Sequence, residues 1–417
     1  MRRLSLLLIA VLVLLFVGVA DAENWARFRG PGGKGISSQK GLPVTWTDKD
    51  YKWKIAVPGL GHSSPCVWDN HVFLTSALHK GAQRLVMAIA ADSGKVLWTD
   101  KLASNTHEKH ALNSYASGTP ASDGTRVFVL FTTNDDTVVR AYNFAGKPLW
   151  QTDVGRFYNQ HGHGCGTSPI VFEELVILAN DQKKNSFLLA LDRKTGKQKW
   201  KIPRKGERAC YSTPCVFSTP GRPTEIIFVH CFEGIVGVDP ASGRQNWMID
   251  VFGTFPQRAV GSPVVWKDLV IANSGALNGG KNAVVVRPAS RGGKHSASEV
   301  YRVSRSAPHV PSPLACEGKL FLWSDIGVVT CAEVETGKVI WQQRAGGKFH
   351  GSPVCVDGRL FCVAEKGTVV VLSASDKFEV LARNELGDTC RSTPAVSGGR
   401  MYIRSVGQLF SIGGAKK

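Results

Sequence analysis

A Ser-Pro or Thr-Pro step recurs eight times along this 417-residue chain, and successive steps lie between 40 and 55 residues apart. The steps are Ser64-Pro65, Thr119-Pro120, Ser168-Pro169, Thr213-Pro214, Ser262-Pro263, Ser312-Pro313, Ser352-Pro353 and Thr393-Pro394. A period of this size indicates radially arranged units, since a four-stranded propeller blade needs about 40–45 residues plus insertions. The repeat therefore predicts an all-β, eight-bladed β-propeller built from four-stranded antiparallel blades.

The third repeat shows how one blade is built. Residues 167–171 start an innermost strand at a proline, and 175–179 form a continuous apolar strand that is buried between neighbouring blades. A third strand covers 186–191, the turn 192–197 contains a glycine that accepts positive φ, and Trp200 opens an outer strand whose edge it covers. The same turn and tryptophan recur in most repeats, although the fifth and seventh repeats lack the tryptophan.

The last repeat, 392–413, contains three strands at most. The start of the propeller offers a fourth strand at 51–57, with Trp53 in the place of the repeat tryptophan. Pairing this strand with the last blade removes two exposed sheet edges. We therefore expect residues 51–413 to form one closed ring; a strand packed elsewhere is the alternative.

The ends of the chain lie outside this ring. Residues 1–22 read as a signal peptide, with a basic start, a short apolar run and an Ala-Asp-Ala cleavage site. This predicts export to the periplasm or the extracellular space, with a retained membrane anchor as the alternative. Residues 23–50 form an N-terminal segment leading into the propeller, whose glycine-rich part 30–35 is expected to be flexible and at the surface. Residues 414–417 form a C-terminal tail.

The chain is basic, with a formal net charge of +18. Such an excess of positive charge attracts anionic partners; a basic surface that only aids solubility is the alternative. Nucleic acid is not expected as the partner of an exported protein. Export also permits disulfides between the ten cysteines. The spacing suggests bridges within a blade, Cys215 with Cys231 and Cys316 with Cys331; buried free thiols are the alternative.

Loops that enter the innermost strands of a propeller converge on one mouth of its central channel. Here each of these loops directly precedes a Ser/Thr-Pro step, and in seven of the eight blades it carries arginine or histidine. The predicted ligand-binding residues are His62, His163, Arg208, Arg258, His309, His350 and Arg391. The second-blade loop carries His107, Lys109 and His110 further out, and His161 precedes His163. Arginine donates in a planar fork to carboxylate, sulfate or phosphate, so the ring predicts an anion site; side chains that only solvate the channel are the alternative.

Two segments carry a resemblance to a known family. Residues 190–200, ALDRKTGKQKW, resemble the A-x-D-x-x-T-G-x-x-x-W pattern of the pyrroloquinoline-quinone-like (PQQ-like) repeat, and 24–31, NWARFRGP, resemble the start of secreted bacterial PQQ-like propellers. The similarity covers about 24–413. This superfamily includes quinoprotein alcohol and glucose dehydrogenases and cofactor-free scaffolds such as the outer-membrane β-barrel assembly lipoprotein, so the fold does not decide the function.

Quinoprotein dehydrogenases hold PQQ over a calcium ion with acidic and amide oxygens, usually beside a disulfide of adjacent cysteines. Here Glu207, Asp388 and Asn113 are scattered, and adjacent cysteines are absent. We therefore assign no catalytic residue, metal ligand or cofactor. We expect an exported monomer that acts as a non-catalytic binding or scaffold protein, with a partner protein or anionic ligand at its basic mouth. A PQQ- and calcium-dependent alcohol or sugar oxidoreductase and an anionic polysaccharide-binding protein remain alternatives.

Overall fold

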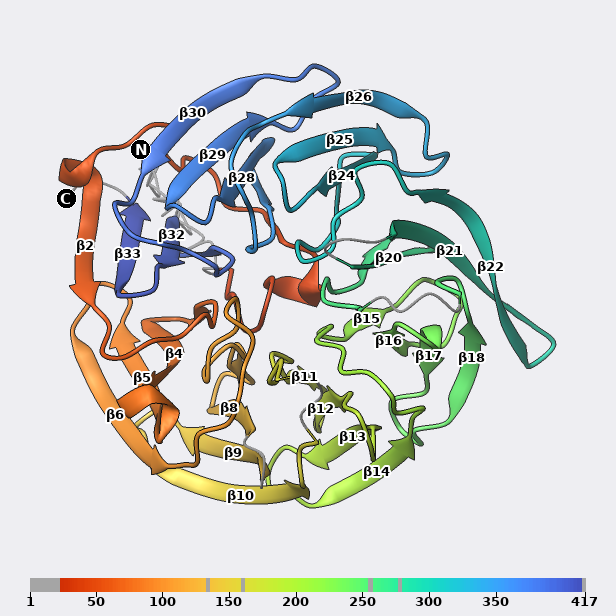
Figure 1. Ribbon diagram of the computed structural model, residues 1–417, viewed down its shortest axis with the longest axis horizontal. Helices are drawn as coiled ribbons and strands as arrows, with labels where there is room; N and C mark the ends of the chain where they lie inside the picture. Colours follow the sequence, from red (N-terminus) through yellow and green to blue (C-terminus); the bar gives the residue numbers. More distant parts are fainter. Residues whose placement is uncertain (1–22, 133–135, 159–161, 254–257, 277–279, 415–417) are drawn as a thin grey trace, which may run out of the picture.

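The computed structural model describes residues 23–132, 136–158, 162–253, 258–276 and 280–414. In this part of the chain eight β-sheets surround a common axis (Figure 1), each with a core of four antiparallel strands that in seven blades run outward in chain order. The predicted eight-bladed propeller is confirmed. The predicted signal peptide and the last three residues of the predicted tail lie outside the described residues.

Each blade begins with a short strand at the axis and ends with a strand at the rim. Blades 1 to 4 consist of β3 (Cys66–Trp68), β4 (His71–Leu78), β5 (Gln83–Ala90), β6 (Val96–Ala103); β7 (Ala121–Ser122), β8 (Arg126–Thr132), β9 (Thr137–Asn143), β10 (Pro148–Gly155); β11 (Ile170–Phe172), β12 (Leu175–Asn180), β13 (Phe187–Asp192), β14 (Gln198–Pro203); and β15 (Cys215–Phe217), β16 (Glu225–His230), β17 (Gly234–Val238), β18 (Gln245–Ile249). Blades 5 to 8 consist of β19 (Val264–Trp266), β20 (Leu269–Gly275), β21 (Lys281–Arg291), β22 (Lys294–Val303); β23 (Leu314–Cys316), β24 (Lys319–Trp323), β25 (Val328–Glu333), β26 (Val339–Arg344); β27 (Val354–Val356), β28 (Arg359–Val363), β29 (Thr368–Ser373), β30 (Val380–Glu385); and β31 (Ala395–Ser397), β32 (Arg400–Arg404), β33 (Gln408–Gly413), β2 (Tyr51–Ala56). Helical structure in the described residues is confined to three 3₁₀ turns, η1 (Pro31–Gly33), η2 (Asp48–Asp50) and η3 (His79–Gly81).

The ring closes as the sequence predicts. Strand β2 from the start of the propeller pairs antiparallel with β33 near its end, in a register that places Tyr51 opposite Ile412 and Ala56 opposite Gln408. The two ends of the ring therefore share one sheet, and β33 is paired on both sides.

The Ser or Thr of each recurring step takes part in hydrogen bonds between neighbouring blades. The backbone N–H of Thr119 donates to the hydroxyl of Ser168 at 2.9 Å, and that of Thr393 donates to Ser64 at 2.9 Å across the closure. The same bond joins step to step at seven of the eight junctions. A small hydroxyl residue is needed at each step because it is the acceptor for the neighbouring blade.

In five blades the tryptophan of the outer strand donates its indole N–H to a backbone carbonyl of the next blade, whereas Trp247 of blade 4 donates to Glu225 of its own blade. Trp200 donates its indole N–H to the Pro240 carbonyl at 2.8 Å, and its ring lies where a Cβ on Gly243 would approach within 2.7 Å. The turn glycine is therefore required both for its positive φ and for this close contact. In blade 5, which lacks the tryptophan, Tyr301 packs over Gly337 and donates its hydroxyl to Val334 at 2.7 Å.

The N-terminal segment is only partly at the surface: within 30–35, Pro31, Gly32 and Lys34 are exposed as predicted, whereas the other three residues are buried. Trp25 is fully buried and pairs with Val67, and η1 lies at the propeller axis (Figure 1). Gly30 has a φ of 64°, and a Cβ there would lie 2.4 Å from the Trp25 ring. The glycines thus permit tight packing inside the channel, a role that local composition does not distinguish from flexibility.

After crossing the axis, the N-terminal segment joins the last part of the ring. Strand β1 (Ile36–Ser37) adds to blade 7 as a fifth strand, parallel to β27. Further on, the Trp46 backbone N–H donates to the Asn384 side chain at 2.9 Å, and the buried Trp46 packs in one cluster with Ala382. The seventh blade, which lacks the repeat tryptophan, thereby gains one from elsewhere in the chain.

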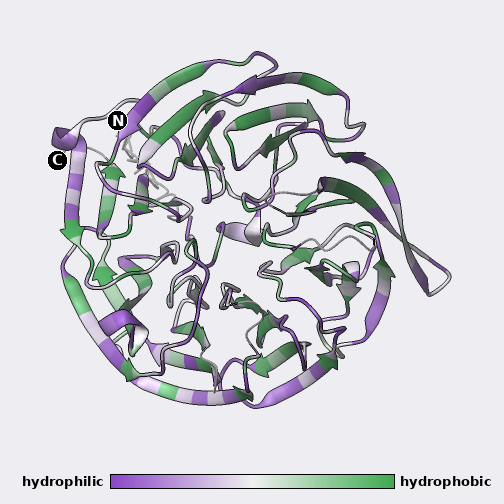
Figure 2. Ribbon diagram, in the orientation of Figure 1, coloured by the Kyte–Doolittle hydropathy of each residue, from purple (hydrophilic) through white to green (hydrophobic). Residues whose placement is uncertain are grey.

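The hydrophobic core lies between blades. Residues of neighbouring blades share each cluster; Ala190 of blade 3, for example, packs in one cluster with Val236 of blade 4. The middle strands are mostly hydrophobic in Figure 2, whereas the rim strands alternate. Among the described residues, no helix has the length and apolar character needed to cross a membrane.

Neither predicted cysteine bridge is present, because the strand pairing places other partners beside these thiols. Cys316 lies 2.8 Å from Cys355 of the next blade, measured between the sulfurs, and Cys231 lies 3.4 Å from Cys210. All ten cysteines are free thiols, as in the alternative expectation, and nine of them are buried.

Candidate functional site at the axial cavity

A cavity of about 320 Å³ opens on the propeller axis. The hydroxyl residues of all eight Ser/Thr-Pro steps form its neck, and Phe28 of the N-terminal segment closes its floor. The loops before the innermost strands form its walls. The cavity lies where the loops before these steps surround the axis.

All seven residues that the sequence singled out line this one cavity: His62, His163, Arg208, Arg258, His309, His350 and Arg391. They come from seven loops, one for each blade except the second. From the second blade His110 also lines the cavity, with its ring stacked on that of His163 at 5.1 Å between centroids. His107 lies behind the wall, buried, with Nε2 3.2 Å from the Thr132 carbonyl. His161 lies outside the described residues.

Two further polar residues of the wall were missed from the sequence. Tyr211 lines the cavity, and burial raises the pKa of its hydroxyl, with the neighbouring Arg258 guanidinium opposing the rise. Asn113 lines it as well, and its side-chain amide donates to the carbonyls of His163 and Cys165, which ties two mouth loops together. Both residues lie a few positions before a Ser/Thr-Pro step, so counting back from each step for every polar residue would have found them.

The carboxylates nearest the mouth stand behind its lining. Glu365 accepts from Arg391 Nη2 at 2.8 Å, and its Oε1 lies 3.5 Å from His350 Nε2. Asp325 accepts the backbone N–H of His309 at 2.8 Å and forms an ion pair with Lys281 at 3.1 Å. Among the described residues that line the cavity there is no aspartate or glutamate. The charged groups of the described lining are therefore basic, and they lie among hydroxyls and apolar side chains such as Leu112, Val260 and Val310.

Three histidines of the wall are held neutral. Burial, followed by the Arg391 guanidinium, lowers the pKa of His62 to about 3. Burial also lowers the pKa of His309 to about 4, although Asp325 opposes this shift, and it lowers the pKa of His350. These three imidazoles therefore add no positive charge to that of the arginines at neutral pH, and a bound anion would favour their protonation.

The floor beneath the cavity contains two more arginines. Arg29 is fully buried and donates to the carbonyls of Pro313 at 2.7 Å and Pro353 at 3.3 Å. Arg27 donates to the Pro214 carbonyl at 2.5 Å. All three carbonyls belong to the Ser/Thr-Pro steps, so the N-terminal segment is anchored directly under the ring of hydroxyls.

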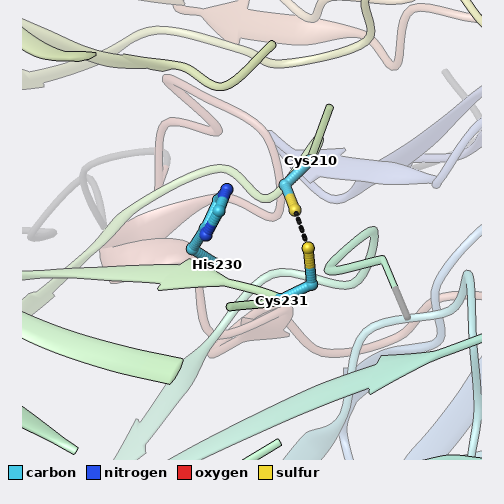
Figure 3. A group of neighbouring side chains, drawn as sticks. All are labelled: Cys210, His230 and Cys231. Atoms are coloured by element: carbon cyan, nitrogen blue, oxygen red, sulfur yellow. Dashed lines mark hydrogen bonds between the residues drawn. The ribbon is translucent and has the colours of Figure 1, made fainter. Parts of the chain in front are cut away.

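Outside the cavity lining, one group of described residues could hold a metal ion. Cys210, His230 and Cys231 are all buried, and their ligand atoms lie within 4.8 Å of one another (Figure 3). Burial and the Arg204 guanidinium lower the pKa of His230 to about 3, so its imidazole is neutral. No metal ligand was expected from the sequence, since the three residues match no short spacing motif and only the loop before β15 brings Cys210 to the other two.

A family model described as "Outer membrane protein assembly factor BamB" matches residues 82–312 and 281–380, well over half of the chain. The chain belongs to this family. The predicted PQQ-like resemblance is confirmed by this match and by the fold.

Individual relatives of this BamB-family chain are distant. It is 21% identical over 276 residues to the outer membrane protein assembly factor BamB of Moranella endobia (strain PCIT), covering 63% of this chain and 66% of the relative. It is 28% identical over 131 residues to the factor of the same name from Francisella tularensis subsp. tularensis (strain SCHU S4 / Schu 4), covering 31% of this chain and 23% of the relative. The chain thus matches less than two thirds of the length of the curated relatives.

Solved structures share the fold at 12% sequence identity. A europium-containing methanol dehydrogenase superposes with a TM-score of 0.69, covering 93% of this chain and 90% of the other. BamB from Moraxella catarrhalis gives 0.62, covering 88% and 97%, and the quinohemoprotein alcohol dehydrogenase from Comamonas testosteroni gives 0.67, covering 94% and 81%. Enzymes and assembly factors therefore share this architecture, and the site must decide between them.

The cavity of this BamB-family propeller does not fit PQQ held over calcium. Calcium requires several oxygen ligands, chiefly carboxylates. The described lining offers none, and the nearest carboxylates, Glu365 and Asp325, are already paired with Arg391 and Lys281. The donor set instead suits an anion.

Proposed function

We propose that this chain is an exported, monomeric, non-catalytic binding module, and that an acidic segment of a partner protein is seated in its axial cavity. One observation carries this function: seven arginine and histidine side chains from seven blades converge on a single cavity whose described lining contains no carboxylate.

The hydrogen-bonding capacity of the wall supports an anionic ligand. Arg258 is buried, and its Nη1 donates only a long bond of 3.3 Å to the Ala209 carbonyl. Arg208 and Arg391 line the same cavity, and a guanidinium is a hydrogen-bond donor only. A carboxylate would accept from such donors, and buried polar atoms gain most from being paired.

The relatives support a scaffold role in the periplasm. Those that align with this chain are named outer membrane protein assembly factors, and an assembly factor binds proteins rather than converting a substrate. The predicted signal peptide agrees with export. An extended acidic peptide would enter the cavity end-on, since its walls are loops rather than an open sheet edge.

The direct test uses a synthetic hexaglutamate peptide as the probe, with its binding to residues 23–417 measured by titration calorimetry. We expect Arg208→Ala combined with Arg391→Ala to weaken binding roughly 10- to 100-fold, because each arginine offers charge-assisted hydrogen bonds. The matched control is Arg244→Ala with Arg291→Ala, which removes the same charge from exposed positions in a rim turn and at a hairpin tip. The control should change the affinity by less than about 3-fold at moderate salt.

Three outcomes would contradict the proposed function. Equal losses in both double variants would mean that the peptide responds to net charge alone. Tighter binding of a heparin hexasaccharide than of hexaglutamate, with the same dependence on Arg208 and Arg391, would favour the polysaccharide alternative. Dye-linked alcohol oxidation on addition of PQQ and calcium, abolished by a chelator, would make the protein an oxidoreductase.

A further inference from the structure

A second candidate site lies behind the cavity wall, in blade 4. Cys210 belongs to the loop before β15, His230 is the last residue of β16, and Cys231 follows it (Figure 3). The three side chains are at most 3% exposed. The two sulfurs lie 3.4 Å apart, and a ring nitrogen of His230 lies within 4.8 Å of both.

These distances suit a small thiophilic cation. In a tetrahedral zinc site with Zn–S bonds of about 2.3 Å, two thiolate sulfurs lie about 3.7 Å apart, so the observed separation needs little adjustment. A disulfide would require the sulfurs to approach to about 2.05 Å. It would also leave unexplained why a buried histidine faces the pair.

The hydrogen bonding of His230 is weak enough for a metal ion to compete with it. Its Nδ1 accepts the Phe232 N–H at 3.3 Å, a long bond, and among the described residues its Nε2 has no hydrogen-bond partner. Nδ1 can ligate a metal if it stops accepting the Phe232 N–H. Nε2 can ligate a metal if the ring proton moves to Nδ1, which also ends that contact. Either way, one long hydrogen bond is replaced with a metal–nitrogen bond.

The charge balance of the site favours a divalent ion. Two thiolates neutralise Zn²⁺, and an electrically neutral cluster can be buried at low cost. The neighbouring ionic groups do not oppose a cation, since Arg204 lies 2.8 Å from Glu233 and 3.4 Å from Asp181, so that one guanidinium faces two carboxylates. The positive charge nearest the site is therefore already paired.

We propose that Cys210, His230 and Cys231 bind one Zn²⁺ ion, which fixes the loop carrying Arg208 and Tyr211 against the hairpin of β16 and β17. Three protein ligands leave one tetrahedral position for water. The metal site is separate from the axial cavity, so it stands whether or not the cavity binds an acidic peptide. In blade 4 the metal ion would hold the loop to the hairpin through side-chain ligands, in addition to the hydrogen bonds of the repeated step.

The test begins with reduced, metal-free protein titrated with Co²⁺, which reports thiolate ligation by a charge-transfer absorption band. We expect one Co²⁺ per chain, displaced by Zn²⁺, with the band lost in Cys210→Ser and in Cys231→Ser. His230→Gln should weaken binding at least 10-fold, since it removes one of three ligands. The matched control is Cys165→Ser, a cysteine outside the group that should bind as the unmodified chain does.

A second measurement on the unmodified chain keeps the proposal testable if a variant fails to fold. Zn²⁺ should protect Cys210 and Cys231 from alkylation, as identified by mass spectrometry, and should slow amide exchange in residues 205–213. The proposal is overturned if reduced protein shows no charge-transfer band, if the band survives in Cys210→Ser, or if Zn²⁺ leaves the alkylation of both thiols unchanged.

Discussion

The two ends of the axial channel use the same side chain in opposite ways. At the floor, Arg29 and Arg27 are buried, and their guanidinium groups donate hydrogen bonds to prolyl carbonyls of the ring. At the mouth, Arg258 and Arg391 line an open cavity and keep donors that the described residues do not satisfy fully. An arginine near a channel axis is thus structural where backbone carbonyls surround it and available for binding where a cavity faces it.

The difference follows from what each arginine is attached to. The floor arginines lie on a segment that threads through the channel and pairs with blades on both sides, so their partners are brought within reach by backbone pairing. The mouth arginines lie on separate loops, and their contacts between loops are few, such as Arg391 to the Ala111 carbonyl at 3.1 Å and Arg258 to the Ala209 carbonyl at 3.3 Å. Burial lowers the pKa of Arg29 to about 9 and that of Arg27 to about 10, so both stay charged at neutral pH.

The largest effect that would sharpen this comparison is on stability. Arg29→Ala should lower the free energy of unfolding by about 3–5 kcal/mol, because it leaves a cavity and buried carbonyls without a donor. Arg208→Ala should cost less than about 1 kcal/mol. Urea unfolding followed by tryptophan fluorescence measures both. Similar losses in the two variants would remove the distinction between floor and mouth.

A smaller effect is the pH dependence of the free energy of unfolding that a buried histidine at the mouth causes. His309 has a folded-state pKa of about 4, below its ordinary value of 6.5. The unfolded chain therefore binds a proton that the folded chain does not, so stability present above pH 6.5 is lost as the pH falls toward 4. His309→Gln should reduce this loss by on the order of 2 kcal/mol.

Urea unfolding at pH 7, 6, 5 and 4 measures this change. His79→Gln, an exposed histidine outside the cavity, is the control. Hexaglutamate should also reduce the acid loss in the unmodified chain, since a bound anion favours protonated imidazole. Parallel pH curves for the two variants would argue against a buried neutral imidazole at the mouth.

The smallest effect concerns Tyr211, one of the two mouth residues that were not selected from the sequence. Tyr211→Phe removes a buried hydroxyl beside Arg258 and should weaken hexaglutamate binding about 2- to 10-fold, because the hydroxyl helps to position that guanidinium, while leaving the thermal midpoint nearly unchanged. Tyr51→Phe, at the rim of blade 8, is the matched control. An unchanged affinity in Tyr211→Phe would restrict the binding surface to the arginines and histidines.

Much of the site was predictable because each mouth residue stands a few positions before a Ser/Thr-Pro step. The step marks the start of an innermost strand, so the preceding loop must lie at the mouth. Tyr211 and Asn113 obey the same rule but were not selected, since they carry no charge. Phe28 and Arg29 could not be placed this way, because nothing in 23–37 shows that the segment turns inward.

The sequence by itself determined the number of blades, the closure by 51–57 and the convergence of seven basic loops, because each follows from a period that local strand and turn preferences impose. Only the tertiary structure decided which arginines fill the floor, which cysteines lie side by side and what replaces the missing tryptophan of blade 7. These contacts join residues hundreds of positions apart, such as Arg29 with Pro353 and Trp46 with Asn384. No local pattern encodes them, since they depend on the shape of the space that the assembled ring leaves to be filled.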